Sequence, residues 1–378
     1  MKIRNVIVLL CAGVMLTACS EENSNANVQE GDSSAAERKS VSELYLGYEE
    51  LQGKDLGMFT MPESIAPQEI GGLCTFTINK RFTVENEQNG KRVFKAFWGD
   101  DFNESKCGFS KAEGDPSYQY GEGGEDQGYF YNGTISLQRA GAGMLLGDSK
   151  QTLYSAADRE TTVQLAGGTA SIGELTDSVK EFIKSSGADI LYGDFSIEPA
   201  EVFVCDTDKG AYANVVCSAV LNGVPVETYP SHYFKEGYEN GEKTITFYLF
   251  KYLSFYFSGK DRLETVTVPP SYHIFEKKEL TSAITLEGAV ELLKTELAEH
   301  SDYKFSDVKL MYCCRSTKPS DEDTDDDPEM LKQIEERILD MHEEFVPTWC
   351  FTYDISGGEG RNMIKVNAVN GEITIDKE

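Results

Sequence analysis

Short runs in which apolar and polar residues alternate fill most of this chain after Leu73. A period of two predicts β-strands that turn one face toward a core. Examples start at Cys74 (CTFTINKRFTV), Tyr212 (YANVVCSAVLNGVPVE) and Pro347 (PTWCFTYDIS). Asn-Gly pairs, which favour tight hairpin turns, accompany these runs, so antiparallel pairing is expected. At one of them, Asn89-Gly90, we predict a turn into a strand with the sequence KRVFKAFWG.

Two amphipathic stretches interrupt the predicted strands. A capping-box pattern at Ser171-Ile172-Gly173-Glu174 opens the first, and Thr285 is expected to cap the second, which runs from Leu286 to about Glu299. Apolar residues recur at helical spacing in both stretches. The combination predicts an α+β fold in which antiparallel β-sheets are each packed by one or two helices.

The first residues have the features of a bacterial signal peptide. Lys2 and Arg4 precede an uncharged apolar run, residues 6–16, which is shorter than the roughly 20 residues needed to span a bilayer. The run ends in Leu16-Thr17-Ala18-Cys19, which resembles the lipobox of bacterial lipoproteins. The resemblance implies cleavage before Cys19 and attachment of a diacylglyceryl anchor to its thiol.

The stretch that follows the lipobox is predicted to be a tether. Residues 19–40 are rich in Ser, Asn, Glu and Ala and have almost no large apolar side chain. Such a segment cannot bury enough surface to order itself. We therefore expect the mature chain to lie at the extracytoplasmic face of the cell membrane, held by the acyl chains on Cys19.

The chain is strongly acidic, with a formal net charge of −29. Loss of Lys2 and Arg4 with the signal peptide changes this to −31 (−29 − 2). Nucleic acid is an unsuitable partner, because its binding depends on Lys and Arg contacts to phosphate. Electrostatic attachment to anionic lipids is disfavoured for the same reason, so the lipid anchor has to hold the chain at the membrane.

Seven cysteines follow Cys19. They are Cys74, Cys107, Cys205, Cys217, Cys313, Cys314 and Cys350. No spacing typical of a zinc site occurs among them. An exported protein can form disulfides, but an odd number leaves at least one thiol unpaired. We expect mostly free thiols, buried as small apolar side chains.

These features divide the chain into five segments. They are a signal peptide at 1–18, a tether at 19–40, an N-terminal β-rich domain at 41–165, a central α+β unit at 166–280 and a C-terminal α+β unit at 281–378. The last segment contains an insertion at 320–345, which begins as an acidic loop and continues as an amphipathic stretch.

Residues 281–378 resemble a PepSY-type module. The matching positions are Pro347, Trp349 and Phe351 on one strand and the stretch 367–373 (NAVNGEI), which closes a hairpin. This pattern is similar to the C-terminal module of the extracytoplasmic YycH/YycI regulatory proteins and of many lipoproteins of Gram-positive bacteria. The resemblance implies a helix on an antiparallel sheet and a role in binding or regulating a protein partner. The insertion departs from the family's minimal pattern.

A second similarity lies within the chain. A helix, a polar link, a Phe-Ser pair and a strand with a Cys near its end occur twice. The first copy contains Phe195-Ser196 and Cys205, and the second contains Phe305-Ser306 and Cys313. This pattern suggests an internal duplication.

Motifs of well-defined chemistry do not occur in the sequence. HExxH, GxSxG, a P-loop and a dinucleotide-binding glycine pattern are all missing, so no catalytic residue and no cofactor are predicted. Asp321, Asp323 and Asp325 are candidate calcium ligands, since calcium prefers carboxylate oxygens. The EF-hand pattern fails, however, because the twelfth position is Lys332. We interpret this stretch as a solvated acidic loop.

The sequence therefore predicts a lipid-anchored, non-enzymatic extracytoplasmic protein that binds or regulates a protein partner at the membrane surface. The alternative is a lipoprotein that binds a small molecule or glycan on the aromatic run from Tyr248 to Phe257. A hydrolase of cell-wall material is the least supported reading, because no nucleophile or metal constellation is visible. Burial of the aromatic run against helices would favour the first reading over the second.

Overall fold

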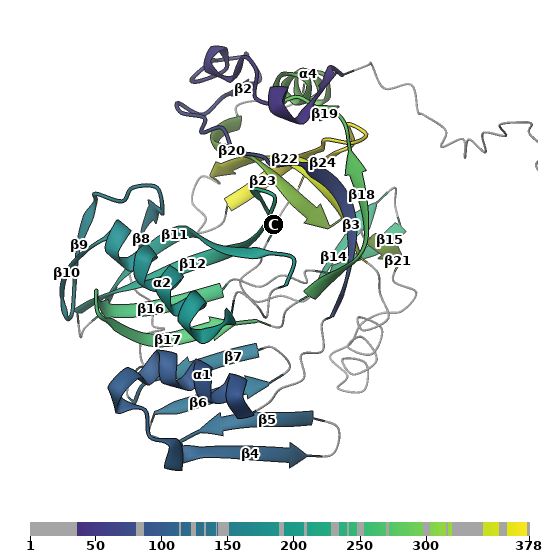
Figure 1. Ribbon diagram of the computed structural model, residues 1–378. Coiled ribbons are helices and arrows are strands. Elements are labelled where there is room, and N and C mark those ends of the chain that lie inside the picture. Colours follow the sequence, from purple (N-terminus) through teal and green to yellow (C-terminus); the bar gives the residue numbers. More distant parts are fainter. Residues whose placement is uncertain are drawn as a thin grey trace, which may run out of the picture. The chain divides into compact units, whose positions relative to one another are not determined.

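The computed structural model describes most of the chain after the predicted tether. The described ranges are 36–80, 87–112, 115–121, 126–131, 134–140, 142, 151–188, 193–207, 210–227, 234–239, 242–247, 253–269, 272–297, 303–314, 317–319, 343–354 and 361–375. They belong to one compact unit, Ala36–Glu378. Helices lie against predominantly antiparallel sheets, so the predicted α+β class is confirmed (Figure 1).

The larger of two main sheets has ten strands, and all its pairings are antiparallel. In spatial order they are β4 (Cys107–Ala112), β5 (Asp115–Tyr120), β6 (Gln127–Tyr131), β7 (Thr134–Gln138), β17 (Arg262–Val268), β16 (Leu253–Gly259), β12 (Gly210–Leu221), β11 (Ser196–Thr207) and β8 (Gln151–Ser155), with β13 (Val224–Pro225) paired to β12.

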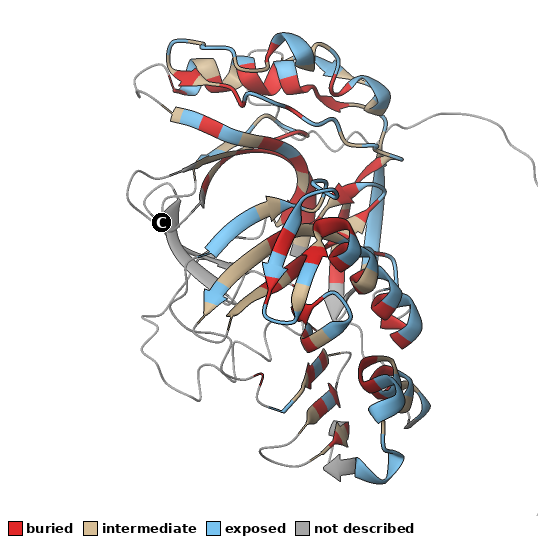
Figure 2. Ribbon diagram, turned by 90° about the vertical axis from the view of Figure 1, so that its left-hand side faces the viewer, coloured by how far each residue is buried: buried red, intermediate tan, exposed pale blue. Residues whose placement is uncertain are grey.

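Two helices cover one face of this sheet. They are α1 (Glu87–Trp98) and α2 (Ile172–Ser186). Trp98 of α1 stacks on Tyr120 of β5 with ring centroids 4.0 Å apart, and Phe182 of α2 packs edge-on against Phe255 of β16 at 5.9 Å. In Figure 2 the two helices lie on the same side of the strands and turn their buried residues toward them. The core therefore forms on that side of the sheet.

Helix α1 corrects a prediction. Residues 91–99 were expected to form a strand after a turn at Asn89-Gly90, yet both turn residues lie inside the helix. The apolar residues Val93, Phe94, Phe97 and Trp98 are spaced one, three and one residues apart, which puts them on one helical face. All four are buried against the sheet. Tertiary packing of this stripe outweighs the local turn preference of Asn-Gly.

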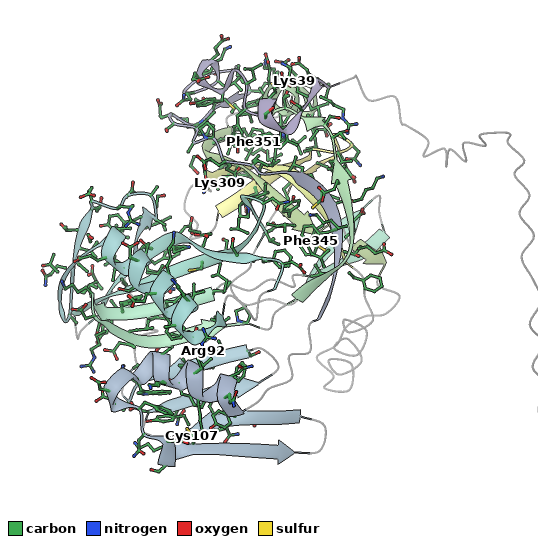
Figure 3. All side chains as sticks on the ribbon, in the orientation of Figure 1. Lys39, Arg92, Cys107, Lys309, Phe345 and Phe351 are labelled. Atoms are coloured by element: carbon green, nitrogen blue, oxygen red, sulfur yellow. The ribbon has the colours of Figure 1, made fainter. Side chains whose placement is uncertain are left out.

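Helix α2 follows its predicted capping box. The Ser171 hydroxyl accepts from the Glu174 amide at 3.0 Å, and the Glu174 carboxylate accepts from the Ser171 amide at 2.9 Å. At the other end, Arg92 points from α1 toward α2 (Figure 3) and donates to the carbonyls of Ser185 and Lys184 at 2.9 and 3.0 Å. Because these carbonyls have no partner within the helix, the guanidinium group caps α2 and links the two helices.

The second main sheet has seven strands. Its spatial order is β18 (Tyr272–Leu280), β3 (Leu73–Lys80), β22 (Glu343–Asp354), β20 (Tyr303–Cys314) and β2 (Phe59–Thr60), with β23 (Arg361–Asn367) paired to β22 and β24 (Ile373–Ile375) paired to β23. Only β2 pairs in parallel. Helix α4 (Leu286–Glu296) begins at the predicted cap residue, whose hydroxyl accepts from the Gly288 amide at 3.0 Å.

Three smaller sheets complete the described strands. They are β14 (Phe234–Glu239) with β15 (Glu242–Phe247) and β21 (Thr317–Pro319), β9 (Thr162–Leu165) with β10 (Gly168–Ser171), and β1 (Arg38–Lys39) with β19 (Ala283–Ile284). Single 3₁₀ turns occur at Val41–Glu43, Tyr48–Glu50, Gly99–Asp101 and Glu104–Lys106.

Each main sheet takes strands from more than one of the segments predicted from the sequence. The ten-stranded sheet takes β4 to β8 from the range 41–165 and β11, β12, β13, β16 and β17 from the range 166–280. The seven-stranded sheet takes β2 and β3 from the first range, β18 from the second and its other strands from 281–378. The suggested duplication has a counterpart in element order, because α2 and α4 are each followed by two antiparallel strands of 12 residues.

Gly90 provides a direct test of how α1 packs. A Cβ atom at this position would lie 1.9 Å from Cδ1 of the buried Tyr118 ring. We expect Gly90→Ala to lower the free energy of unfolding by about 1–3 kcal/mol, as overpacking usually does, although Ala favours helices over Gly by roughly 1 kcal/mol. Urea unfolding followed by tryptophan fluorescence measures the change.

Gly108→Ala in β4 is the matched control, because no heavy atom lies within 4 Å of the added methyl group there. An increase in stability for Gly90→Ala, as at an exposed helical position, would contradict the packing described for α1.

Candidate functional site

The strand that carries the Pro347-x-Trp349 motif changes its neighbour at Pro347. On one edge β22 pairs with β20 along almost its whole length. On the other edge its residues 343–345 pair with β3 and residues 348–354 pair with β23. The Pro347 carbonyl accepts from the Ala368 amide at 2.8 Å, but proline has no N–H to return. The proline therefore leaves the Ala368 carbonyl open to another donor.

That donor is the backbone of Ile284 in β19. The Ile284 amide donates to the Ala368 carbonyl at 2.8 Å, and the Ile284 carbonyl accepts from Nε1 of Trp349 at 2.8 Å. Trp349 and Ala368 are fully buried. We call the four residues Pro347, Trp349, Ala368 and Ile284 the junction. Three of them are positions on which the PepSY resemblance rests, and their shared task here is to bind β19 to the sheet.

The junction also holds residues from the end of the predicted tether at 19–40, because the structure describes the chain from Ala36 onward. Arg38 and Lys39 form β1 and pair with Ile284 and Ala283. Lys39 lies beside α4 in Figure 3. The Glu37 carbonyl accepts from the Thr285 amide at 3.1 Å. The chain thus joins the folded unit at the N-terminus of α4.

A hairpin turn beside the junction agrees with the sequence prediction in part. The Asn367 side chain accepts from the amides of Val369 and Asn370 at 2.8 and 3.3 Å. Gly371 has φ of +80°, as the predicted Asn370-Gly371 turn requires. Asn370 does not share this conformation, since Asn222 is the one non-glycine residue with positive φ among the described residues.

The segment between β1 and β3 covers the same sheet. The ring of Tyr45 meets Trp349 edge-on at 5.0 Å, and burial raises the pKa of the Tyr45 hydroxyl. That hydroxyl donates to Oε1 of Gln68. The Gln68 amide accepts from the Leu310 N–H at 2.8 Å and donates to the Leu310 carbonyl at 3.0 Å. The Gln68 side chain thereby takes the place of a neighbouring strand at Leu310, on the edge of β20 that does not face β22.

A charged pair is buried on the opposite face of β22 and β23. Nζ of Lys365 lies 2.6 Å from Oε1 of Glu227, and the two side chains are 12% and 5% exposed. The Glu227 amide donates to the Tyr312 carbonyl at 2.9 Å, which fixes the carboxylate beside β20. Charges in such surroundings persist only when they are paired and hydrogen-bonded.

Free thiols lie near this pair, as the sequence predicted. None of the seven described cysteines forms a disulfide, and Cys74, Cys217, Cys313 and Cys350 are buried. The Sγ atoms of Cys313 and Cys350 are 3.5 Å apart. The contact with Cys350 and burial raise the pKa of the Cys313 thiol. The Cys313 thiol is therefore held in the protonated, unreactive form.

Several predicted site residues lie outside the described residues. These are the lipid-attachment residue Cys19 and the candidate calcium ligands Asp321, Asp323 and Asp325. Within the ranges that the structure describes, no group of three or more His, Cys, Asp or Glu side chains is arranged to hold a metal ion. None of the helices described has the length and apolar character required to cross a membrane.

The aromatic run proposed as a ligand platform is described from residue 253 onward. Phe255 and Phe257 are buried, and Phe255 packs under Phe182 of α2. Tyr256 points to the other face of the sheet and is half-buried. Of the predicted platform from Tyr248 to Phe257, the described residues Phe255 and Phe257 therefore contribute to the core, and Tyr256 contributes to the outer face of the sheet.

Three residues that stabilise this region could not be identified from the sequence. Gln68, Glu227 and Lys365 are ordinary polar residues in the sequence, and their partners are distant along the chain. Two weak signals exist: Lys365 lies between the apolar residues Ile364 and Val366, and Glu227 directly follows the apolar stretch Val224-Pro225-Val226. Neither signal identifies the partner.

No protein-family model matches the chain, and no curated protein matches it in sequence. It is similar in fold to an uncharacterized protein from Eubacterium rectale whose crystal structure is known at 1.45 Å resolution. The TM-score is 0.52 at 15% sequence identity, and the match covers 85% of this chain and 91% of the other. The similarity concerns the fold alone and extends over nearly all of both chains.

The buried ion pair generates a testable expectation. Lys365→Met removes the positive partner of the buried Glu227 carboxylate, and breaking a buried ion pair on one side typically costs about 3–5 kcal/mol. Urea unfolding of the purified variant measures the change in the free energy of unfolding.

The double variant Lys365→Met with Glu227→Leu is the control, because it removes both charges. We expect it to recover most of the lost stability. Equal losses in the single and the double variant would mean that packing of the lysine stem, and not the charge, matters at this position.

Proposed function

We propose that this chain is a lipid-anchored extracytoplasmic protein that binds or regulates a protein partner at the membrane surface without catalysing a reaction. The lipobox-like Leu16-Thr17-Ala18-Cys19 and the polar tether after it support the anchor. In this proposal the diacylglyceryl group on Cys19 is the membrane attachment. The PepSY-like unit 281–378 is the part that meets the partner.

The observation that carries the proposal is the point at which the tether joins the fold. Arg38 and Lys39 pair with β19, directly before α4. Sixteen residues separate Cys19 from Ala36 (36 − 19 − 1). A flexible chain of that length has a root-mean-square span of roughly 20–25 Å. The anchor would therefore hold α4 and the junction within reach of the extracytoplasmic parts of membrane proteins.

Confinement of this kind strengthens weak contacts. A partner in the same membrane meets the module at an effective concentration set by the tether and not by bulk dilution. The acidic composition adds selectivity, since the net charge of −31 (−29 − 2) after loss of Lys2 and Arg4 favours partners with basic extracytoplasmic surfaces. Calcium binding by Asp321, Asp323 and Asp325 remains a separate and subordinate proposal.

The test is crosslinking in intact cells, followed by affinity capture and mass spectrometry. We expect the wild-type chain to enrich one membrane protein and Cys19→Ala to lose that enrichment, because the unacylated chain leaves the membrane surface. Incorporation of a labelled fatty acid into wild type, but not into Cys19→Ala, establishes the modification in the same cells.

A variant with a tether of doubled length is the matched control, because it keeps the anchor and weakens the confinement. Capture should fall with the longer tether but not vanish. Acylation of Cys19 without enrichment of any membrane protein would refute the partner-binding proposal.

A further inference from the structure

The face of the ten-stranded sheet opposite α1 and α2 has an unusual composition for this chain. Two neighbouring rows of residues cross it from β5 or β6 to β8. The first row is Gln119, Tyr129, Ser136, Thr267, Ser254, Val216, Glu201 and Ser155. The second row is Gln127, Gln138, Thr265, Tyr256, Asn214, Phe203 and Leu153. Glu201 is the one charged residue in these two rows.

A solvated face of a protein with net charge −29 would be expected to carry many charges. The exposed side of α2 meets this expectation, with Glu174, Asp177, Lys180 and Glu181. The two rows on the outer face instead carry amides, hydroxyls, two tyrosines and three apolar residues, Val216, Phe203 and Leu153. Amide side chains both donate and accept hydrogen bonds, and a tyrosine ring offers an apolar surface with a polar tip.

One uncharged part of the two rows lies on β5, β6, β7, β17 and β16. It consists of Gln119, Tyr129, Ser136, Gln138, Thr265 and Tyr256, which we call the outer-face strip. Tyr129 is 47% exposed at its centre, and Ser136 beside it is exposed. With strands about 4.8 Å apart, the strip extends roughly 20 Å across the sheet.

We propose that the outer-face strip binds a neutral polysaccharide. Sugar rings present C–H faces that stack on tyrosine, and each hydroxyl donates and accepts as the amides of Gln119 and Gln138 do. The strip has no cation to pair with phosphate, sulfate or carboxylate groups and no carboxylate cluster for a basic peptide. Absence of charge throughout the strip therefore favours a neutral ligand over an anionic glycan or a charged protein surface.

The test is affinity electrophoresis of the full chain carrying Cys19→Ala, in gels that contain one soluble polysaccharide each. Hydroxyethyl cellulose, galactomannan, arabinoxylan and amylopectin are the neutral probes, and polygalacturonate is the anionic one. We expect at least one neutral probe to retard the protein and polygalacturonate to have no effect. Tyr129→Ala should weaken the retained binding at least tenfold, because stacking on the exposed ring is lost.

Phe275→Ala is the matched control. Phe275 is 52% exposed on β18 of the other main sheet, so its removal should leave binding unchanged. Thermal unfolding verifies that both variants are folded. Failure of all four neutral probes, equal retardation by polygalacturonate, or wild-type affinity of Tyr129→Ala would each overturn the proposal.

The outcome is separate from that of the partner-binding proposal. Crosslinking to a membrane protein depends on Cys19 and is expected to persist in Tyr129→Ala. Loss of that crosslink in Tyr129→Ala, without retardation by any polysaccharide, would assign the outer-face strip to the protein partner and refute its assignment to a glycan.

Discussion

The missing N–H of Pro347 determines how the chain is tied together around α4. A proline inside a central strand leaves one carbonyl of the neighbouring strand without its donor. Here that carbonyl belongs to Ala368, and the Ile284 amide satisfies it. The Ile284 carbonyl is in turn satisfied by the indole of Trp349. Two buried hydrogen bonds thereby hold β19 against the sheet, and an unmade bond at either position would cost about 1–3 kcal/mol.

The arrangement gives a physical role to each residue of the motif Pro347-x-Trp349 and of the stretch Asn367-Ala368 with its glycine turn. Pro347 leaves the Ala368 carbonyl without a donor from β22, and Trp349 supplies an indole donor two residues later. The small side chain of Ala368 allows β19 to approach β23 closely. Asn367 and Gly371 then turn the chain into β24. The motif is thus a docking device for the strand that receives the tether. In the proposed function, the same contacts keep α4 close to the end of the membrane tether.

Local chemistry predicted much of the fold, and long-range packing decided the rest. The caps of α2 and α4, the strands β3, β20, β22 and the turns at Gly223 and Gly371 depend on neighbouring residues and could be read directly. Helix α1 could not, because an Asn-Gly pair near its start imitates a turn. The Gln68–Leu310 and Glu227–Lys365 pairs, and the mixing of strands between sheets, join residues that no local pattern relates. The aromatic composition of the run could be read from the sequence. Which of its side chains point into the core and which point outward depends on how the strand is placed in the sheet.

The central claim is that the indole of Trp349 secures β19 and hence the start of the folded chain. Hydrogen exchange measured by mass spectrometry on Trp349→Phe and Trp98→Phe tests it directly, since these are the two tryptophans of the chain. Both are buried, but Nε1 of Trp98 has no hydrogen-bond partner among the described residues. The account predicts roughly tenfold or faster exchange in peptides covering 36–46 and 281–290 for Trp349→Phe, and wild-type exchange there for Trp98→Phe. Equal exchange of these peptides in both variants would contradict it.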